Sequence, residues 1–205
     1  PICEGYGLSE TSPSASCNPT TSTQFTGNIG VPLPSTFMKL LDDEGHEVTE
    51  LGQAGEIAIK GPQVMAGYWQ RPDETARSMT ADGYFKSGDI GIRDVHGFFK
   101  IIDRKKDMIL VSGFNVYPND IEEAVSLCPG VLECAAVGVP DEKTGEAVKL
   151  VIVKKDPTLT EMAVREYCKA NMTGYKQPKI IEFKVELPKT AVGKILRREL
   201  RDAPK

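Results

Sequence analysis

The sequence predicts an α+β fold in two parts, a small β-rich, barrel-like part followed by a compact α+β domain. Three observations lead to this prediction. Residues 35–102 carry short strand patterns separated by turn sequences, residues 103–107 form a charged run, and residues 108–205 mix strand and helix periodicities. The chain has 205 residues, 40% hydrophobic and 26% charged, which is the balance of an ordinary globular protein.

The first part consists mainly of expected strands and turns. Residues 1–34 are rich in Ser, Thr, Gly and Pro, and we expect loops there. A strand begins at Phe37 and ends at the turn DDEG. In the next strand, GEIAIKG (55–61), the isoleucines alternate with Glu, Ala and Lys, which is typical of a half-buried strand. DIGIRD, DVHG and FFKIID predict a hairpin, so the β-rich part ends near Ile102.

The charged run DRKKD (103–107) has no apolar anchor and is typical of a linker. After it, MILVSG (108–113) predicts a strand. A helix is then predicted from a single apolar face with helical spacing, and Pro129 with Gly130 should end it. The residues of that face are Ile121, Ala124, Val125 and Cys128.

The remainder of the chain continues the mixed pattern. Strands are expected at 131–139 and 147–153, joined by the turn PDEKTGE. Thr160 is a candidate N-cap of a helix that runs to Cys168, with Ala163, Val164 and Tyr167 as further apolar positions. A strand at 180–185 and a helix at 194–200 complete the order βαββαβα, which predicts a compact α+β domain.

Composition excludes several classes of protein. The net charge of −4 provides no basic field for nucleic acid. No apolar run approaches the ~20 residues of a membrane helix. The five cysteines are odd in number and have no CxxC spacing, so they predict neither a disulfide framework nor a zinc site, and a reducing cytosol fits best. Because the chain starts with proline in a strand-like pattern, we expect it to be part of a longer protein.

The segment EGYGLSETSP (4–13) has residues suited to a nucleotide. Gly5 and Gly7 flank Tyr6, so the backbone can approach a flat ring while the phenol stacks on it. Ser9 can donate a hydrogen bond to a phosphate, and Glu10 offers a hard oxygen to Mg²⁺. Taken alone, the segment fits an ordinary surface loop equally well.

Two further segments carry polar residues of the same kind. In YFKSGD (84–89), Asp89 suits bidentate bonding to a ribose diol, although it also fits a residue that caps a turn. In DRKKDMILVSGFNVYP (103–118), Arg104 can direct its donors to ribose or phosphate, and Gly113 leaves room for a ligand beside the backbone. A charged linker followed by a core strand explains this second segment as well.

The last candidate is Lys194 in LPKTAVGKILRREL (187–200), where a flexible Gly precedes a mobile cation that can reach a developing negative charge. A basic amphipathic helix explains KILRREL, but the Thr-x-x-Gly-Lys sequence before it is not needed to start a helix. No catalytic histidine arrangement emerges, because His46 and His96 lie in expected hairpin turns. PTTSTQFTG (19–27) has a single Gly and no Gly-Lys, so it fails the P-loop pattern.

The order of these motifs is more specific than any one of them. EGYGLSE, GEIAIKGPQVMAGYW, YFKSGD, DRKKDMILVSGFNVYP and PKTAVGK resemble the ordered motifs of the adenylate-forming superfamily, which includes acyl-CoA synthetases, firefly luciferase and adenylation domains of peptide synthetases. The resemblance covers essentially the whole chain. GPQVMAGYWQRPDET, DRKKDMILVSGFNVYPNDIEE and GKILRRELRD look most like bacterial long-chain fatty acid–CoA ligases.

The resemblance implies a domain organisation and a two-step reaction. Residues 1–34 would be the remnant of a large N-terminal adenylation domain, 35–102 its β-rich subdomain, 103–107 a hinge, and 108–205 a mobile C-terminal domain. A carboxylate would attack the α-phosphate of Mg·ATP to give acyl-adenylate and pyrophosphate. The CoA thiol would then displace AMP, after a large rotation of the C-terminal domain. ATP, a fatty acid and CoA are thus the implied substrates, with Mg²⁺ as cofactor.

The resemblance also implies residue roles at the nucleotide. Tyr6 would stack on adenine in a pocket lined by Gly5 and Gly7, and Ser9 would contact phosphate, where the family more often has Thr. Glu10 would bind Mg²⁺.

Five further positions have implied roles in the ribose site and the two steps. Asp89 would bind the ribose hydroxyls with help from Arg104. Lys106, at the hinge, would be a further nucleotide-binding residue. Lys194 would stabilise charge at the α-phosphate during adenylation and leave before thioester formation, when Gly113 would line the CoA tunnel.

Several alternatives stay open at this stage. The acid pocket and the Ser/Thr/Gly-rich phosphate loop of the family lie upstream of these residues, so an aryl- or medium-chain acid–CoA ligase fits too, and the chain alone should be inactive. A non-catalytic nucleotide- or carrier-binding module is the second alternative. We expect a cytoplasmic location. A peripheral contact with the inner face of the membrane is compatible with a long-chain substrate, but only the helix at 194–200 is a candidate for it. The sequence leaves the oligomeric state open.

Overall fold

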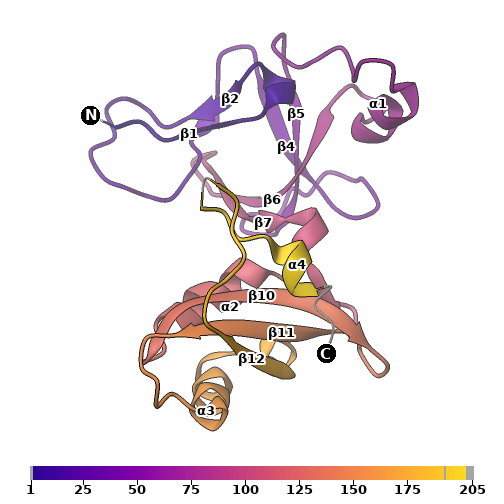
Figure 1. Ribbon diagram of the computed structural model, residues 1–205. Coiled ribbons are helices and arrows are strands. Elements are labelled where there is room, and N and C mark those ends of the chain that lie inside the picture. The colour runs from indigo at the N-terminus through magenta and orange to yellow at the C-terminus, as the bar shows by residue number, and fades with distance from the viewer. Residues whose placement is uncertain (1, 192, 202–205) are drawn as a thin grey trace. The chain divides into compact units, whose positions relative to one another are not determined.

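The computed structural model describes residues 2–191 and 193–201 (Figure 1). The chain divides into two compact units, Pro1–Lys105 and Lys106–Lys205. Each unit has its own sheets and its own hydrophobic core, and each is described here by itself.

The first unit begins with a three-stranded antiparallel sheet, where loops had been expected. Its strands are β1 (Gly5–Gly7), β2 (Ser14–Cys17) and β3 (Val31–Pro32), and the short 3₁₀ helix η1 (Ser9–Thr11) joins β1 to β2. Thr11 is fully buried, and its hydroxyl bonds to the backbone on both sides of this connection. Such hydrogen bonds between Ser/Thr side chains and backbone explain why a segment with the composition of a loop is ordered.

The second sheet of this unit has four antiparallel strands in the order β4-β5-β6-β7. The strands are β4 (Phe37–Leu41), β5 (Gly55–Lys60), β6 (Phe85–Arg93) and β7 (Phe99–Arg104), and helix α1 (Pro72–Ser78) lies between β5 and β6 in the chain. The expected alternation in β5 is wrong, because Glu56 and Ala58 are buried together with the isoleucines. β5 is a central strand, and both of its faces are covered.

The charged run 103–107 is not the solvated segment that its composition predicts. Asp103 and Arg104 end strand β7, and η2 (Lys105–Asp107) follows. Asp103 is 2% exposed and Asp107 9% exposed, because their carboxylates accept hydrogen bonds from the Arg104 N–H and the Arg201 guanidinium. The boundary between the two compact units nevertheless falls inside this run, after Lys105.

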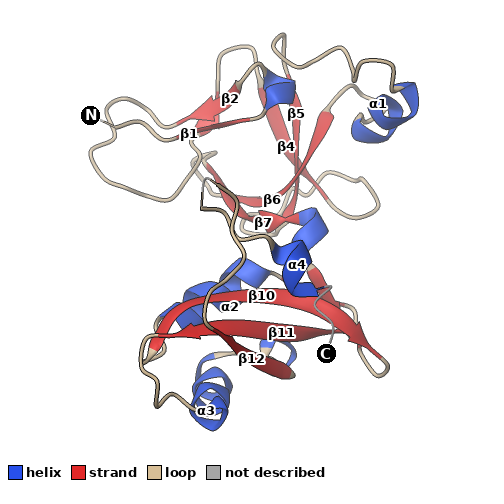
Figure 2. Cartoon of the chain, viewed as in Figure 1, coloured by secondary structure: helices blue, strands red, loops and turns tan. Residues whose placement is uncertain are grey.

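The second unit combines a five-stranded sheet with helices (Figure 2). Its elements are β8 (Ile109–Val111), β9 (Phe114–Val116), α2 (Pro118–Ser126), β10 (Val131–Asp141), β11 (Gly145–Lys154), α3 (Glu161–Asn171), η3 (Gly174–Lys176), β12 (Ile180–Lys184) and α4 (Arg197–Arg201). β11 pairs with β10 and β8 in antiparallel fashion and with β12 in parallel. No helix in the described ranges is both long and apolar enough to cross a membrane.

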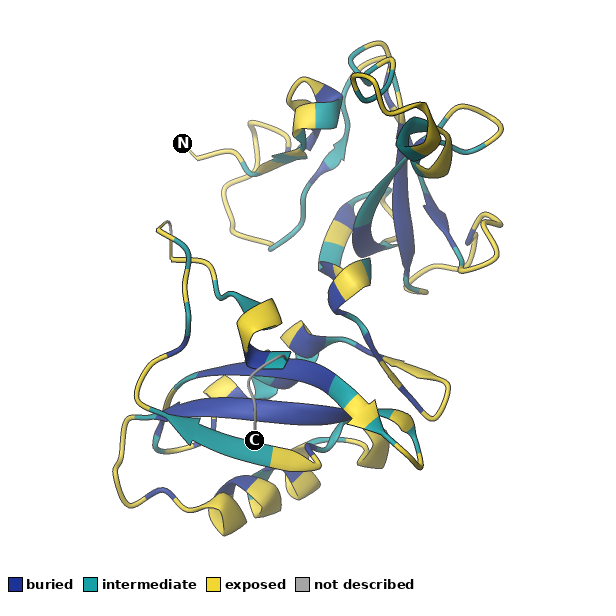
Figure 3. Ribbon diagram, turned by 45° about the vertical axis from the view of Figure 1, so that its right-hand side comes forward, coloured by how far each residue is buried: buried dark blue, intermediate teal, exposed yellow. Residues whose placement is uncertain are grey.

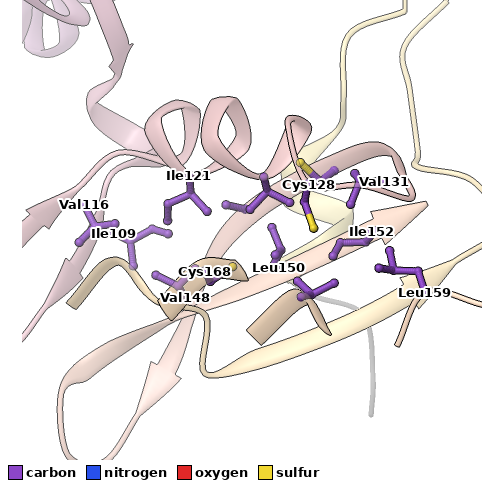
Figure 4. Packing of buried hydrophobic residues seen from close by; sticks show 14 of the residues in the cluster. Ile109, Val116, Ile121, Cys128, Val131, Val148, Leu150, Ile152, Leu159 and Cys168 are labelled. Carbon is purple, nitrogen blue, oxygen red and sulfur yellow. The ribbon is translucent and has the colours of Figure 1, made fainter. Parts of the chain in front are cut away.

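The two faces of the β10–β11 ladder are covered by different helices. Even-numbered residues such as Ala136 and Leu150 pack with α2 and α3, and Figure 4 shows Ile121 and Cys128 above this face. Odd-numbered residues pack instead with Leu187 and with Leu200 of α4. Figure 3 shows that the central parts of β10 and β11 are buried, and nearly all residues there are apolar, as expected for strands covered on both faces.

Two expected elements of this unit need correction. The stretch 108–113 is not one strand, because the chain reverses at Ser112 and Gly113, both with φ above +50°, into the β8–β9 hairpin. The observed order is therefore ββαββαβα. The last helix begins at Arg197 and not at residue 194, because Ile195 pairs with Lys189 as an isolated bridge.

Two helices need smaller adjustments. Helix α2 starts at Pro118, three residues before its apolar face, where a fixed φ suits the first helical turn. Helix α3 runs on to Asn171, past the expected end at Cys168. Its N-cap is confirmed, since the Thr160 hydroxyl accepts from Ala163 N, although Ala163 itself is exposed.

Candidate active site

Tyr6 and Asp89 meet in the first unit although 83 positions separate them in the chain. The Tyr6 hydroxyl donates a 2.6 Å hydrogen bond to Asp89 Oδ2. Burial, reinforced by this bond to a carboxylate, raises the pKa of the Tyr6 phenol far above its usual value. Tyr6 therefore remains a protonated donor at every physiological pH, and its hydroxyl holds one Asp89 oxygen in place.

A bulge in strand β6 presents Asp89. Glu56 is opposite Ile90 and Ala58 is opposite Lys86, so the register between β5 and β6 shifts where Gly88 and Asp89 lie. Gly88 has φ +74°, a conformation that favours glycine. Bulges re-aim side chains and are common beside active sites. Asp89 therefore lies within strand β6. The alternative from the sequence, a residue that only caps a turn, does not describe it.

Arg104 completes this group from the neighbouring strand. It is opposite Asp89 in the β6–β7 register, and its Nε lies 3.4 Å from Asp89 Oδ1. The Asp89 carboxylate is buried to 7% exposure, whereas the Arg104 side chain is 56% exposed. Three residues that the sequence singled out separately, Tyr6, Asp89 and Arg104, therefore form one cluster. A fixed carboxylate beside an aromatic ring and an exposed guanidinium has the chemistry to hold the diol and base of a nucleoside.

Glu10 has a partner that sequence reasoning missed. The Tyr68 hydroxyl donates a 2.9 Å hydrogen bond to Glu10 Oε1, and the Glu10 carbonyl accepts from Met65 N at 2.8 Å. These contacts bring the GYW segment to Glu10, a pairing that spacing in the sequence does not reveal. Ser9 starts η1 and is exposed.

The donor set around Glu10 is compatible with Mg²⁺. Tyr68 occupies one carboxylate oxygen of Glu10, which leaves the other oxygen available. Magnesium in phosphate-handling sites is usually held by one or two carboxylates, with phosphate oxygens and waters as further ligands. A single oriented carboxylate is therefore a sufficient protein contribution.

The glycines on each side of Tyr6 are needed by the backbone itself. A Cβ atom at Gly7 would lie 1.7 Å from the Pro13 carbonyl oxygen, so no other residue fits there without moving the chain. At Gly5 a Cβ atom would be 3.2 Å from the Ser16 carbonyl oxygen, which is tight but less severe. Close packing of β1 against the chain from Pro13 to Ser16 explains both glycines.

In the second unit, a small loop built on Thr190 holds Lys194. The Thr190 N–H donates to the Lys194 carbonyl at 2.8 Å, and the Lys194 N–H donates to the Thr190 hydroxyl at 3.1 Å. Gly193 takes φ +82° and bonds to the Thr190 carbonyl. The Thr-x-x-Gly-Lys sequence therefore builds a turn that fixes the Lys194 backbone and leaves its side chain exposed.

The other two predicted positions also belong to the second unit. Gly113, with φ +83°, sits at the β8–β9 turn and faces open space. Lys106 is exposed, and its carbonyl accepts a 3.4 Å hydrogen bond from Arg201. The contacts of the structure thus join Tyr6, Asp89 and Arg104 to one another, whereas Lys106, Gly113 and Lys194 belong to the other compact unit.

Each of the two compact units matches a known protein family. Residues 1–69 match the family described as AMP-binding enzyme, and residues 120–194 match the AMP-binding enzyme C-terminal domain. A long-chain-fatty-acid–CoA ligase of Escherichia coli O6:H1 is 58% identical over 98% of this chain. The chain spans 36% of the length of that relative.

Solved structures of known proteins also match nearly the whole of this chain. ATP-bound MatB from Rhodopseudomonas palustris matches 98% of this chain and 40% of its own at a TM-score of 0.91 and 35% identity, whereas apo MatB matches at 0.69. The o-succinylbenzoate CoA synthetase MenE of Bacillus subtilis, solved with the acyl-adenylate intermediate OSB-AMP, matches 100% of this chain and 42% of its own at a TM-score of 0.86 and 33% identity.

Proposed function

Because this chain belongs to the AMP-binding enzymes, we propose that its protein is an ATP-dependent long-chain fatty acid–CoA ligase. The observation that carries the proposal is the convergence of Tyr6, Asp89 and Arg104 into one cluster. The 58% identity to a ligase of that name supports the choice of acid and thiol. The reaction converts a fatty acid, ATP and CoA into acyl-CoA, AMP and pyrophosphate.

The chemistry runs in two steps. A carboxylate oxygen of the fatty acid attacks the α-phosphorus of ATP, and the bond from that phosphorus to the pyrophosphate oxygen breaks. The CoA sulfur then attacks the acyl carbon, and AMP leaves with the carboxylate oxygen that joined it to the acyl group. MenE with its bound acyl-adenylate supports an intermediate of this kind in the family.

In the proposed complex, the Tyr6 cluster binds the nucleoside. The Tyr6 ring stacks on adenine while its hydroxyl holds Asp89, which leaves Asp89 lone pairs to accept hydrogen bonds from the ribose hydroxyls. Arg104, whose Nε lies 3.4 Å from the same carboxylate, donates to ribose or phosphate. Gly5 and Gly7 line the adenine pocket as backbone.

Ser9 and Glu10 serve the phosphates. The Ser9 hydroxyl donates to a phosphate oxygen, and Glu10, oriented by Tyr68, would hold Mg²⁺. The bound Mg²⁺ would neutralise charge on the phosphates as pyrophosphate leaves.

The second unit supplies a different residue to each step. Lys194, presented by the Thr190 turn, stabilises the charge that develops at the α-phosphate during adenylation. The C-terminal domain (108–205) then rotates about the hinge at 103–107, with Lys106 at the pivot. Lys194 leaves, and the turn at Gly113 lines the CoA tunnel. Two transition states with different leaving groups require different preorganised contacts, and a domain rotation exchanges them.

The two structures of MatB support such a change of conformation among the relatives. They match this chain at 35% and 36% identity but with TM-scores of 0.91 with ATP and 0.69 without it. Such different structural agreement at nearly the same sequence identity is what a change of conformation between the two MatB structures would give.

The alternative to a long-chain fatty acid as the acid substrate is an aromatic acid. The acid of MenE is o-succinylbenzoate by its name, so an aryl acid–CoA ligase is the runner-up on the same chemistry. We place the protein in the cytoplasm, where ATP and CoA are available, and we propose no membrane contact.

The test is pyrophosphate release by the full-length enzyme with CoA, across short-, medium- and long-chain fatty acids and several aryl acids. Fastest turnover with long-chain acids supports the proposal. Fastest turnover with aryl acids keeps the chemistry and overturns the substrate. Absence of turnover with every acid overturns the ligase proposal in favour of a nucleotide-binding module.

A further inference from the structure

A buried carboxylate, Glu56, belongs to the same sheet as Asp89 and Arg104. Glu56 is on β5, the strand next to β6, and it is 8% exposed. A glutamate at such a position is rare unless its charge is paired and its oxygens are bonded. Nothing in the reaction described above uses Glu56, so its place in the core needs another explanation.

The first oxygen of Glu56 supports the bulge that presents Asp89. The Gly88 N–H donates to Glu56 Oε1 at 3.1 Å. In the bulge, this N–H is displaced from the regular ladder between β5 and β6. A buried N–H without a partner is costly, so the Glu56 carboxylate stabilises the bulged backbone immediately before Asp89.

The second oxygen of Glu56 fixes the chain that follows Arg104. Lys105 Nζ lies 3.0 Å from Glu56 Oε2 and 3.4 Å from Asp43 Oδ1. Lys105 directly follows Arg104 at the end of β7, and it is the last residue of the first compact unit. One carboxylate therefore holds the residue before Asp89 and the residue after Arg104.

We propose that Glu56 is a positioning residue of the nucleotide site, which sets the Asp89 carboxylate and the Arg104 guanidinium for the ribose hydroxyls. This inference rests on the proposed nucleotide site. Glu56 itself does not touch the nucleotide; it acts through Gly88 and Lys105. Its removal should therefore weaken recognition of the ribose in particular, and not the binding of adenine or phosphates.

The experiment compares ATP with 2′,3′-dideoxyATP, which lacks the ribose hydroxyls, by calorimetric titration of the full-length protein without acid substrate. Glu56→Ala should weaken ATP binding about tenfold and dideoxyATP binding less than about twofold. Glu56→Gln keeps an acceptor for Gly88 but loses the ion pair with Lys105, so it should recover about half of the loss on a logarithmic scale. Glu182→Gln is the matched control. It breaks a glutamate–lysine pair (Glu182 Oε2 to Lys149 Nζ, 2.7 Å) in the other unit and should change neither affinity.

Two results would overturn the inference. Equal weakening of ATP and dideoxyATP would mean that Glu56 only stabilises the fold, and unchanged affinities in both Glu56 variants would mean that it positions nothing. If Glu56→Ala does not fold, Glu56→Gln decides by the same comparison. Failure of the unmodified protein to bind ATP is a distinct result, because it would remove the proposed function and this inference together.

Discussion

Tyr6→Phe removes a single hydroxyl from the proposed site and leaves the aromatic ring. The lost bond is a 2.6 Å contact from a half-buried phenol to a carboxylate that is 7% exposed. Hydrogen bonds to charged groups contribute about 1.5–3 kcal/mol. Arg104 remains beside Asp89, but at 3.4 Å and with a side chain 56% exposed, so it compensates little. Because the Tyr6 phenol is only half-buried, we take the lower value of about 1.5 kcal/mol, which corresponds to about tenfold weaker nucleotide binding.

The assay is titration of the full-length protein with AMP in the presence of EDTA, so that Mg²⁺ does not contribute. Tyr6→Phe should bind AMP about tenfold more weakly, and Tyr6→Ala more weakly still because the stacking ring is lost too. Tyr84→Phe is the control, since Tyr84 belongs to the same unit and its ring packs against the ammonium groups of Lys39 and Lys60, which lie 4.2 and 5.6 Å from its centroid. Unchanged AMP affinity in Tyr6→Phe would refute the role of the Tyr6–Asp89 bond.

Three further predictions concern the second unit. Lys194→Ala should slow adenylation by about 10²–10³-fold and spare thioester formation from preformed acyl-adenylate; equal losses in the two half-reactions would contradict its role. Lys106→Pro should slow thioester formation and spare adenylation, because proline restricts the hinge. A Lys106→Pro variant that still forms the thioester fast would show that the pivot lies elsewhere. Burial raises the pKa of Cys134 from 9.0 to about 12, so the free energy of unfolding should fall as pH rises from 9.0 towards 12. A Cys134→Ala variant with the same alkaline loss would assign the effect to other groups.

The sequence predicted best where local pattern and chemistry coincide. The β6–β7 hairpin follows from its turn residues and is present. The Thr-x-x-Gly-Lys sequence, singled out for its lysine, forms the turn at Thr190 that the sequence did not predict. Tyr6, Asp89 and Arg104 were each selected for chemistry that a nucleotide needs. Their mutual contacts are set by strand pairing and by an 83-residue separation, which no local pattern encodes.

Tertiary contacts explain what the sequence did not predict. Asp107 lies in a charged run yet is buried, because Arg201 from the end of the chain reaches it. Residues 194–196 have helical periodicity, but the bridge between Lys189 and Ile195 delays the helix. The bond from Tyr68 to Glu10 likewise joins distant segments. The partners of Asp107 and Glu10 are remote in sequence, and the bridge at Ile195 competes locally with the helix, so neither kind of contact follows from residue preference alone.

The central claim is that ATP and the acid react through an acyl-adenylate. The most direct measurement uses the full-length enzyme, CoA, ATP and a long-chain fatty acid labelled with ¹⁸O in its carboxylate, with mass analysis of the products. The account predicts one labelled oxygen in AMP, because the carboxylate oxygen that attacks the α-phosphorus leaves with AMP when the CoA sulfur attacks the acyl carbon. Acyl-CoA formed together with unlabelled AMP, or with the label in inorganic phosphate, would contradict it.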